Sequence, residues 1–228
     1  MIKDSLYEQL YPLTTVAGQH FVEDFSGNTL DTFRWGKDTD DGTVAMSDSV
    51  NGGVILTTGA GLYDSVCIGF LADSTSGGAN VPLCFDSQGA VIQFVEQWGT
   101  ASTGVNTTTN GFHSERRGDN AGNNACAMEL GKWNTNYQLR TCNSVGAQTD
   151  TDSGISAAGG GSISTNKNFF RVEIQPTFAT MSINGVLGST AGTNLPSGGL
   201  APCFGIQNHS TGGASILHVI YCEAWNTA

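Results

Sequence analysis

Residues 169–187 read FFRVEIQPTFATMSINGVL, and this stretch decides the fold. Every second residue from Phe170 to Ile174 is apolar, which is the period of a strand that buries one face. The same alternation returns from Thr180 to Ile183, and Asn184-Gly185 follows as a strong signal for a two-residue hairpin turn. The stretch therefore predicts antiparallel strands joined by tight turns.

Short apolar runs bounded by Gly, Asn, Asp and Ser clusters recur on both sides of this hairpin. The runs predicted to be strands are Val54–Thr57, Ser65–Leu71, Ala90–Trp98, Ala125–Leu130, Tyr137–Cys142, Phe169–Gln175, Thr180–Ile183, Cys203–Gln207 and Ser215–Trp225. Their regular spacing predicts an all-β sandwich of two antiparallel sheets. The last run is apolar on both faces, so we expect a central strand that closes the fold beside the N-terminal strand.

Three stretches are rich in Gly, Ser, Thr and Asn and poor in large apolar residues. They are residues 73–80, 99–111 and 150–165, and their composition predicts surface loops.

Residues 1–18 differ from the rest because they hold the one candidate helix, Ile2–Tyr11, which Pro12 would end. The predicted organisation is an N-terminal arm over 1–18 and a single β-sandwich domain over 19–228. An apolar stripe on this helix would anchor the arm to a partner, through Leu6, Tyr7, Leu10 and Tyr11.

The chain is acidic: nine Lys and Arg residues face 20 Asp and Glu residues among 228, for a net charge of −11. Such a charge repels phosphate backbones and anionic membrane surfaces, so no nucleic-acid partner is expected. The sequence also has no apolar run as long as a signal peptide or a membrane-spanning helix requires. We therefore expect a chain that is neither exported through a signal peptide nor inserted into a membrane.

Six cysteines are widely spaced without any C-x-x-C pair, which disfavours a zinc site. Most lie in apolar runs, where a thiol behaves as a small hydrophobic group. Buried, reduced cysteines are the favoured interpretation, with disulfides as the alternative. The residues are Cys67, Cys84, Cys126, Cys142, Cys203 and Cys222.

Several segments resemble concanavalin A-like lectin and glucanase domains over roughly residues 19 to 228. Phe21–Gly27 and Leu30–Trp35 are similar to the opening of such domains. The final strands follow in the family's order, in Phe170–Ile174, Met181–Val186, Leu195-Pro196, Leu200–Asn208 and Leu217–Trp225. The resemblance implies a jelly-roll sandwich. Domains of this kind also resemble bacteriophage virion proteins, an analogy of fold only.

Laminarinase-like glycosidases of this fold carry their catalytic acids on one strand, in the motif E-x-D-x-x-E. This sequence lacks that motif. Its acids stand alone on their predicted strands, at Glu96, Glu129, Glu173 and Glu223. Glu96 shares a face with Ile92, Phe94 and Trp98 and is interpreted as a hydrogen-bonded residue of the concave face. The cluster His113–Arg117 is only a weak match to lyase chemistry. We therefore predict no catalytic residues and no enzymatic activity.

Binding residues are sought among aromatic side chains with polar neighbours, because a sugar ring stacks on an aromatic face. The candidate glycan-binding residues are Trp133, Tyr137, Trp98 and Glu96. No cofactor and no metal ligand is predicted. A structural calcium ion stays open because acidic residues cluster on predicted loops, at Asp38, Asp40 and Asp41 and at Asp150 and Asp152.

The predicted function is a non-catalytic bacteriophage structural protein, a capsid decoration or fibre-type module on the virion surface. Its expected partners are the major capsid protein or other virion proteins, host surface glycans and further copies of itself. Two alternatives remain open: a lectin-like carbohydrate-binding domain, and a divergent glycoside hydrolase or polysaccharide lyase.

Overall fold

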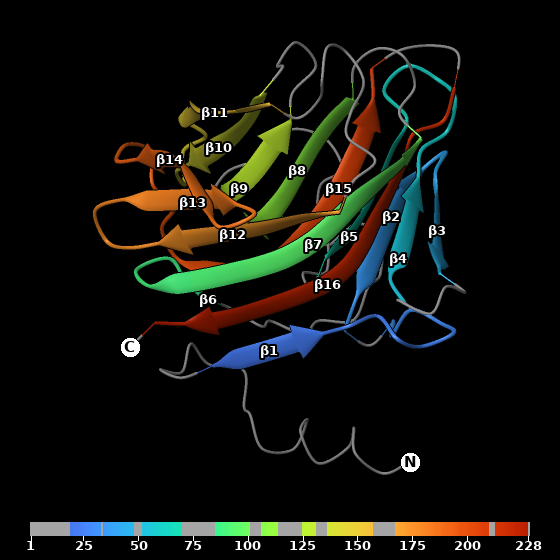
Figure 1. Ribbon diagram of the computed structural model, residues 1–228, viewed down its shortest axis with the longest axis horizontal. Helices are drawn as coiled ribbons and strands as arrows, with labels where there is room; N and C mark the ends of the chain where they lie inside the picture. The colour runs from blue at the N-terminus through green and yellow to red at the C-terminus, as the bar shows by residue number, and fades with distance from the viewer. Residues whose placement is uncertain are drawn as a thin grey trace.

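The computed structural model describes residues 19–32, 34–47, 52–69, 85–100, 106–113, 125–130, 136–156, 167–209 and 213–227. Within these ranges sixteen strands form two antiparallel sheets, and no helix is present (Figure 1). The predicted all-β jelly-roll sandwich is thereby confirmed. No helix in the described part of the chain has the length and apolar character that crossing a membrane requires.

Sheet A is built around the two longest strands, which lie side by side in antiparallel register. Its order is β14 (Val186–Ala191), β13 (Ala179–Ile183), β12 (Asn168–Ile174), β7 (Ala90–Thr100), β16 (Ile216–Asn226), β4 (Val54–Thr57) and β3 (Thr43–Met46), with β1 (His20–Glu23) paired to β16.

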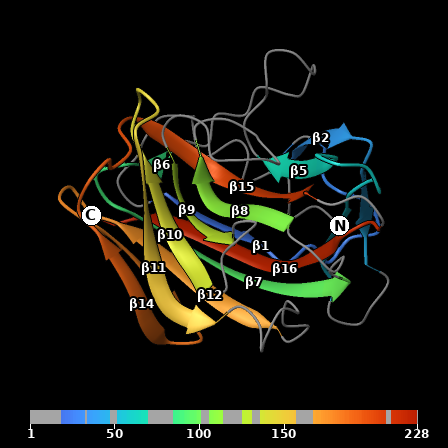
Figure 2. The ribbon, with the colours of Figure 1, turned by 90° about the horizontal axis from the view of Figure 1, so that it is seen from above.

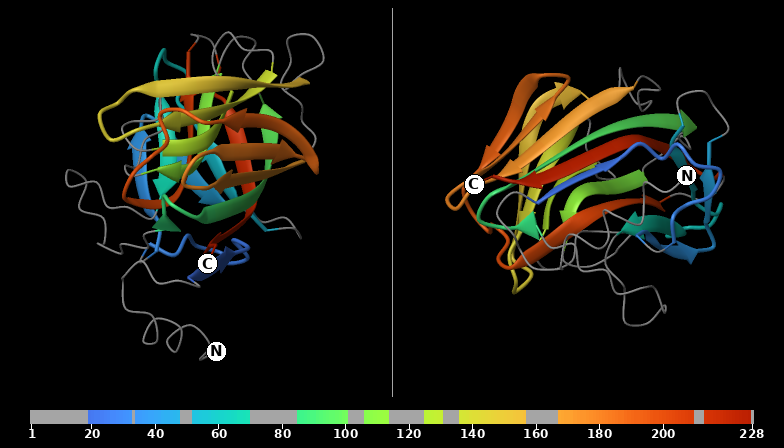
Figure 3. Two further views of the ribbon diagram at one scale, coloured as in Figure 1. Left: turned by 90° about the vertical axis from the view of Figure 1, so that its left-hand side faces the viewer. Right: turned by 90° about the horizontal axis from the view of Figure 1, so that it is seen from below.

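Sheet B packs face to face against sheet A (Figures 2 and 3). Its order is β11 (Gln148–Ser156), β10 (Asn136–Cys142), β9 (Ala125–Leu130), β8 (Asn106–His113), β15 (Gly199–Asn208), β5 (Ser65–Gly69) and β2 (Gly36–Asp40), with β6 (Phe85–Asp86) paired to β15.

One apolar core fills the space between the sheets. The Phe94 and Phe170 rings of sheet A stack with their centroids 5.1 Å apart, and Phe94 meets Phe204 of sheet B edge-on at 5.3 Å. Offset and edge-to-face contacts of this kind add to the free energy gained from burying each ring. The core thus joins strands that are distant in the sequence.

The predicted hairpin is confirmed. Ile183 pairs with Val186, and the two turn residues Asn184 and Gly185 have φ angles of 51° and 82°. Positive φ at both positions matches the two-residue turn that follows the right-handed twist of the strands.

The last strand, β16, lies between β7 and β4 and also pairs with β1, as predicted (Figure 1). It is not covered on both faces, however. Leu217 and Val219 are fully buried while His218 between them is partly exposed, so this strand has one core face and one outer face.

Two of the predicted loops are partly strands. The stretch 99–111 contributes the end of β7 and most of β8, and 150–165 contributes most of β11. Their polar composition misled the prediction because Thr108 and Asn110 enter the sandwich interior, where tertiary contacts stabilise them.

Some predictions concern residues outside the described ranges: the arm over 1–18 with Leu6, Tyr7, Leu10 and Tyr11, the loop at 73–80, and Cys84. The other five cysteines are buried in the described structure, and burial is what the favoured interpretation expected.

Candidate functional site

The outer face of sheet B carries the candidate site. Alternate residues of β9, ending with Leu130, enter the core, so Ala125, Ala127 and Glu129 point to the outer face. Both alanines and the glutamate are buried. Glu129 is therefore the one charged side chain that this strand places on the outer face.

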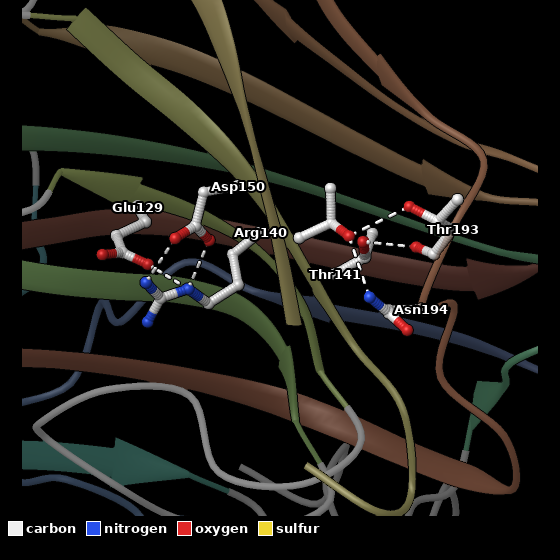
Figure 4. Close-up of polar contacts among 7 residues, drawn as sticks. Glu129, Arg140, Thr141, Asp150, Thr193 and Asn194 are labelled. Carbon is white, nitrogen blue, oxygen red and sulfur yellow. Dashed lines mark hydrogen bonds and ion pairs between the residues drawn. The ribbon is translucent and has the colours of Figure 1, made fainter. Parts of the chain in front are cut away.

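The two strands beyond β9 add an arginine and an aspartate to this face. Arg140 of β10 pairs with Ala127 on one side and with Asp150 of β11 on the other. Residues paired across a ladder point to the same face of the sheet. Glu129, Arg140 and Asp150 thus come together from three neighbouring strands (Figure 4).

Arg140 stands between the two carboxylates. Its Nε donates to Oδ1 of Asp150 at 2.7 Å and its Nη2 donates to Oδ2 at 2.9 Å, a bidentate contact. The same Nε forms an ion pair with Oε2 of Glu129. Glu129 and Arg140 are about as buried as core residues, whereas 28% of the Asp150 side chain is exposed. Solvent therefore reaches the cluster from the side of Asp150.

Burial changes the protonation of Glu129. The pKa of Glu129 is raised from 4.5 to about 7 as the net result of three influences: loss of hydration raises it most, Arg140 lowers it, and the charge of Asp150 raises it. For Arg140, burial alone would lower the pKa, but the hydrogen bond to Asp150 and the charges of Glu129 and Asp150 raise it. The cluster thus holds a fixed cation beside a carboxyl group that titrates near neutral pH.

Glu96 does not lie on this face, contrary to the interpretation from sequence. It is fully buried between the sheets, where Nδ2 of Asn110 donates to its Oε2 at 2.6 Å. Burial raises the pKa of Glu96 to about 8, and the Asn110 hydrogen bond opposes the rise. Its other oxygen, Oε1, has no hydrogen-bond partner among the described residues. Glu96 is therefore an interior carboxyl group without access to a substrate.

The aromatic candidates for glycan binding are also buried. Trp98 is 1% exposed and Tyr137 is 2% exposed, and both belong to the core cluster. The Tyr137 ring meets Phe170 edge-on at 5.1 Å. A ring enclosed in this way has no face free for a sugar. Trp133 lies outside the described residues.

The other two glutamates that the sequence analysis placed on strands belong to the other sheet. Glu173 is ion-paired with Arg171 at 2.9 Å, and Glu223 with His20 at 2.7 Å, both on the outer face of sheet A. The sandwich core separates them from Glu129.

In the described part of the chain, no three His, Cys, Asp or Glu side chains are grouped to hold a metal, and a structural calcium ion stays a prediction from sequence. Asp150 is occupied by Arg140. Asp152 accepts hydrogen bonds from Nδ2 of Asn136 at 3.0 Å and from the Gly154 backbone N–H at 2.7 Å.

Sequence reasoning missed Arg140 and considered Asp150 only as a calcium ligand. Neither residue stands in a local motif, and only the pairing of β9, β10 and β11 brings both to Glu129. The alternation of Asn136, Gln138 and Arg140 with Tyr137 and Leu139 was a usable signal, because it marks a polar face on a strand whose other face is apolar.

Chemically, this cluster can donate a proton near neutral pH. A carboxyl group whose pKa lies near the working pH is suited to general acid catalysis, and Arg140 would stabilise the carboxylate that remains. Asp150 adds a second, partly exposed carboxylate that contacts the same arginine nitrogen.

Comparison with known proteins gives structural relatives only. No family model matches the chain, and no curated protein matches it. A solved structure described as a native glycosidic hydrolase has a TM-score of 0.63 and 17% identity, over 94% of this chain and 99% of that one. A β-glucanase of Bacillus licheniformis has a TM-score of 0.61 and 14% identity, over 94% and 100%. Alginate lyase A1-II′ of polysaccharide lyase family 7 has a TM-score of 0.61 and 12% identity, over 87% and 97%.

These similarities correct the functional prediction. These three structures, matched over 97% to 100% of their own length, are named as enzymes that act on carbohydrates, which contradicts the expectation of a chain without enzymatic activity. Nothing in them supports a role in a bacteriophage virion, so that interpretation remains a prediction from sequence. At identities of 12% to 17%, the similarity shows that the chain has the concanavalin A-like jelly-roll fold.

Proposed function

We propose that this chain is a divergent glycoside hydrolase that binds a polysaccharide on the outer face of sheet B. The observation that carries the proposal is the cluster of Glu129, Arg140 and Asp150 on this face. Glu129 acts as the general acid that protonates the glycosidic oxygen, and Asp150 supplies the second carboxylate.

The assignment of Glu129 as the acid rests on its burial. With a pKa raised to about 7, it is about half protonated at neutral pH, whereas an exposed glutamic acid would be ionised. Arg140 stabilises the carboxylate left after proton transfer, because its guanidinium is fixed in place by Asp150.

The closeness of the two carboxylates favours a retaining mechanism. Glu129 and Asp150 both contact the Nε atom of Arg140, so their oxygens are near each other. Retaining glycosidases place their carboxyl groups about 5 to 5.5 Å apart, and inverting enzymes place them about 6.5 to 9.5 Å apart. In a retaining reaction Asp150 would attack the anomeric carbon, and water would then release the sugar.

The charge of the chain favours a neutral polysaccharide. A net charge of −11 repels uronic acid polymers over the whole surface, and the cation of the cluster is already occupied by Asp150. Cleavage of an acidic polymer by a polysaccharide lyase reaction is therefore the second candidate function, and the following experiment distinguishes it from hydrolysis.

The test uses the full chain against soluble β-glucans and alginate. Release of reducing ends without new ultraviolet absorbance indicates hydrolysis, whereas absorbance of an unsaturated product indicates a lyase. We expect hydrolysis that Glu129→Gln lowers at least about 100-fold, the size of a lost general acid. The control Glu173→Gln removes an ion-paired acid from the opposite sheet and should leave activity unchanged. Full activity of Glu129→Gln would refute the assignment.

A further inference from the structure

Strand β11 has two faces with different roles. Its outer face carries Asp150 and its neighbours Gln148 and Asp152, while Thr149, Thr151 and Ser153 point the other way. This inner face lies against β14, the edge strand of sheet A, and the turn that follows it (Figures 1 and 2). The strand that presents Asp150 is thus held from behind by the opposite sheet.

The contacts are concentrated directly behind Arg140 and Asp150. Oγ1 of Thr141 donates to the Thr193 carbonyl at 2.9 Å, and the Thr149 and Thr193 hydroxyls are 2.9 Å apart. Nδ2 of Asn194 donates to Oγ1 of Thr149 at 3.0 Å. Figure 4 shows Thr141, Thr193 and Asn194 beside the charged cluster.

Thr141 and Thr149 are paired across the β10–β11 ladder, and each is the chain neighbour of a cluster residue. Because successive side chains point to opposite faces, fixing these two hydroxyls fixes Arg140 and Asp150 on the other face.

The same edge is held again further along β11. Oγ of Ser189 donates to the Thr151 carbonyl at 3.1 Å. A Cβ atom at Gly188 would lie 2.8 Å from Cβ of Ser153, so glycine permits this close approach of β14 to β11. The two sheet edges are therefore locked together along the strand that carries Asp150.

We propose that Thr149 of β11 and Asn194, in the turn after β14 of the opposite sheet, are positioning residues of the site: their contact holds Asp150 against Arg140 and thereby sets the charge balance at Glu129. The inference rests on the proposed function, which assigns Glu129 the role of the acid. It adds that the second sheet controls this acid through the turn after β14.

Loss of the Thr149–Asn194 contact has a defined consequence. Among the described residues, the charged or titratable groups on the outer face of the strands around Glu129 are His113 of β8, Arg140 and Cys142 of β10, and Asp150 and Asp152 of β11. Asp150 raises the pKa of Glu129 and Arg140 lowers it. When Asp150 is no longer held on Arg140, the guanidinium turns fully to Glu129, and the pKa of Glu129 falls.

Two variants remove the contact in different ways. Thr149→Val deletes the hydroxyl at nearly constant volume. Asn194→Gly deletes the amide and suits the backbone, because Asn194 has a φ of 51°, which glycine adopts readily. The matched control is Thr180→Val on the outer face of β13, away from the cluster.

The first measurement is the titration of the Glu129 carboxyl carbon by NMR in the full chain, assigned with Glu129→Gln. We expect the pKa of Glu129 to fall by about one unit in both variants and to stay constant in the control. An unchanged pKa in both variants overturns the inference, whatever the activity of the protein. If Thr149→Val does not fold, Asn194→Gly alone decides.

The second measurement is the pH profile of kcat. A fall of one unit reduces the protonated fraction of Glu129 at pH 7 about fivefold. We therefore expect kcat at pH 7 to fall about fivefold, its basic limb to move about one unit lower, and KM to change little. Inactivity of the wild-type protein on every polysaccharide would refute the proposed function, while the titration would still test the positioning.

Discussion

The sharpest consequence of the structure concerns Glu96, the carboxyl group enclosed between the two sheets. Its pKa is raised to about 8 in the folded chain, against 4.5 for an exposed glutamic acid, because burial penalises the charged form. The folded state therefore binds one more proton than the unfolded state between these two pH values. The stability that neutral Glu96 contributes to the folded state is fully present below about pH 4.5, and it is lost as the pH rises towards 8.

The magnitude follows from the shift. About 3.5 units at 1.36 kcal/mol each give about 5 kcal/mol of unfolding free energy lost across this range. Stability of a typical domain is only about 5 to 15 kcal/mol, so the loss is a large fraction of the total.

Glu96→Gln removes the titration without removing the contact. The glutamine carbonyl still accepts the hydrogen bond that Nδ2 of Asn110 donates, and the side chain stays neutral at every pH. We expect the variant to resemble the wild type at pH 5 and to be more stable by several kcal/mol at pH 8.

The assay is urea unfolding followed by tryptophan fluorescence, from pH 5 to 8.5, extrapolated linearly to water. The difference between the two proteins isolates Glu96, because Glu129 titrates in both. Parallel stability curves for the wild type and Glu96→Gln would show that Glu96 is not a buried neutral acid and would refute the reasoning.

Two further predictions concern the packing of each sheet. Gly111→Ala should destabilise the chain by about 1 to 3 kcal/mol in urea unfolding, because Gly111 has a φ of 149° and a Cβ atom there would lie 2.9 Å from Cα of Ala127. The control Gly154→Ala, where no atom lies within 4 Å of the new Cβ, should cost less; equal losses would contradict a steric cause. Phe170→Ala should cost about 3 to 5 kcal/mol by leaving a cavity beside Phe94, measured in the same assay, and a loss below 1 kcal/mol would argue against the stacked core.

Much of the fold was predictable because it depends on local signals. Alternation from Phe170 to Ile174 and the Asn184-Gly185 turn both appear in the structure as predicted. Polar strands were harder to predict, and most of β8 and β11 was predicted to be loop. Their Thr, Asn and Ser side chains favour loops by composition, and contacts with distant segments stabilise them as strands.

The candidate site was predictable only in part. Glu129 was recognised as a strand-borne acid, but Arg140 was not considered. For Glu96, the sequence did contain a signal of burial, but the prediction placed the residue on the concave face instead. It alternates with Phe94 and Trp98, which are core residues, and the same pattern places Glu96 in the core as well.

The sequence by itself determined the all-β class, the tight hairpin, the lack of the single-strand motif E-x-D-x-x-E and the acidic charge. Local periodicity suffices for these, since it fixes which residues share a face of one strand. Only the tertiary structure decided that Glu129, Arg140 and Asp150 meet and that Thr149 is held by Asn194. Such contacts depend on which strands become neighbours and in which register, and that choice is made by burial of the shared core rather than by any short stretch of chain.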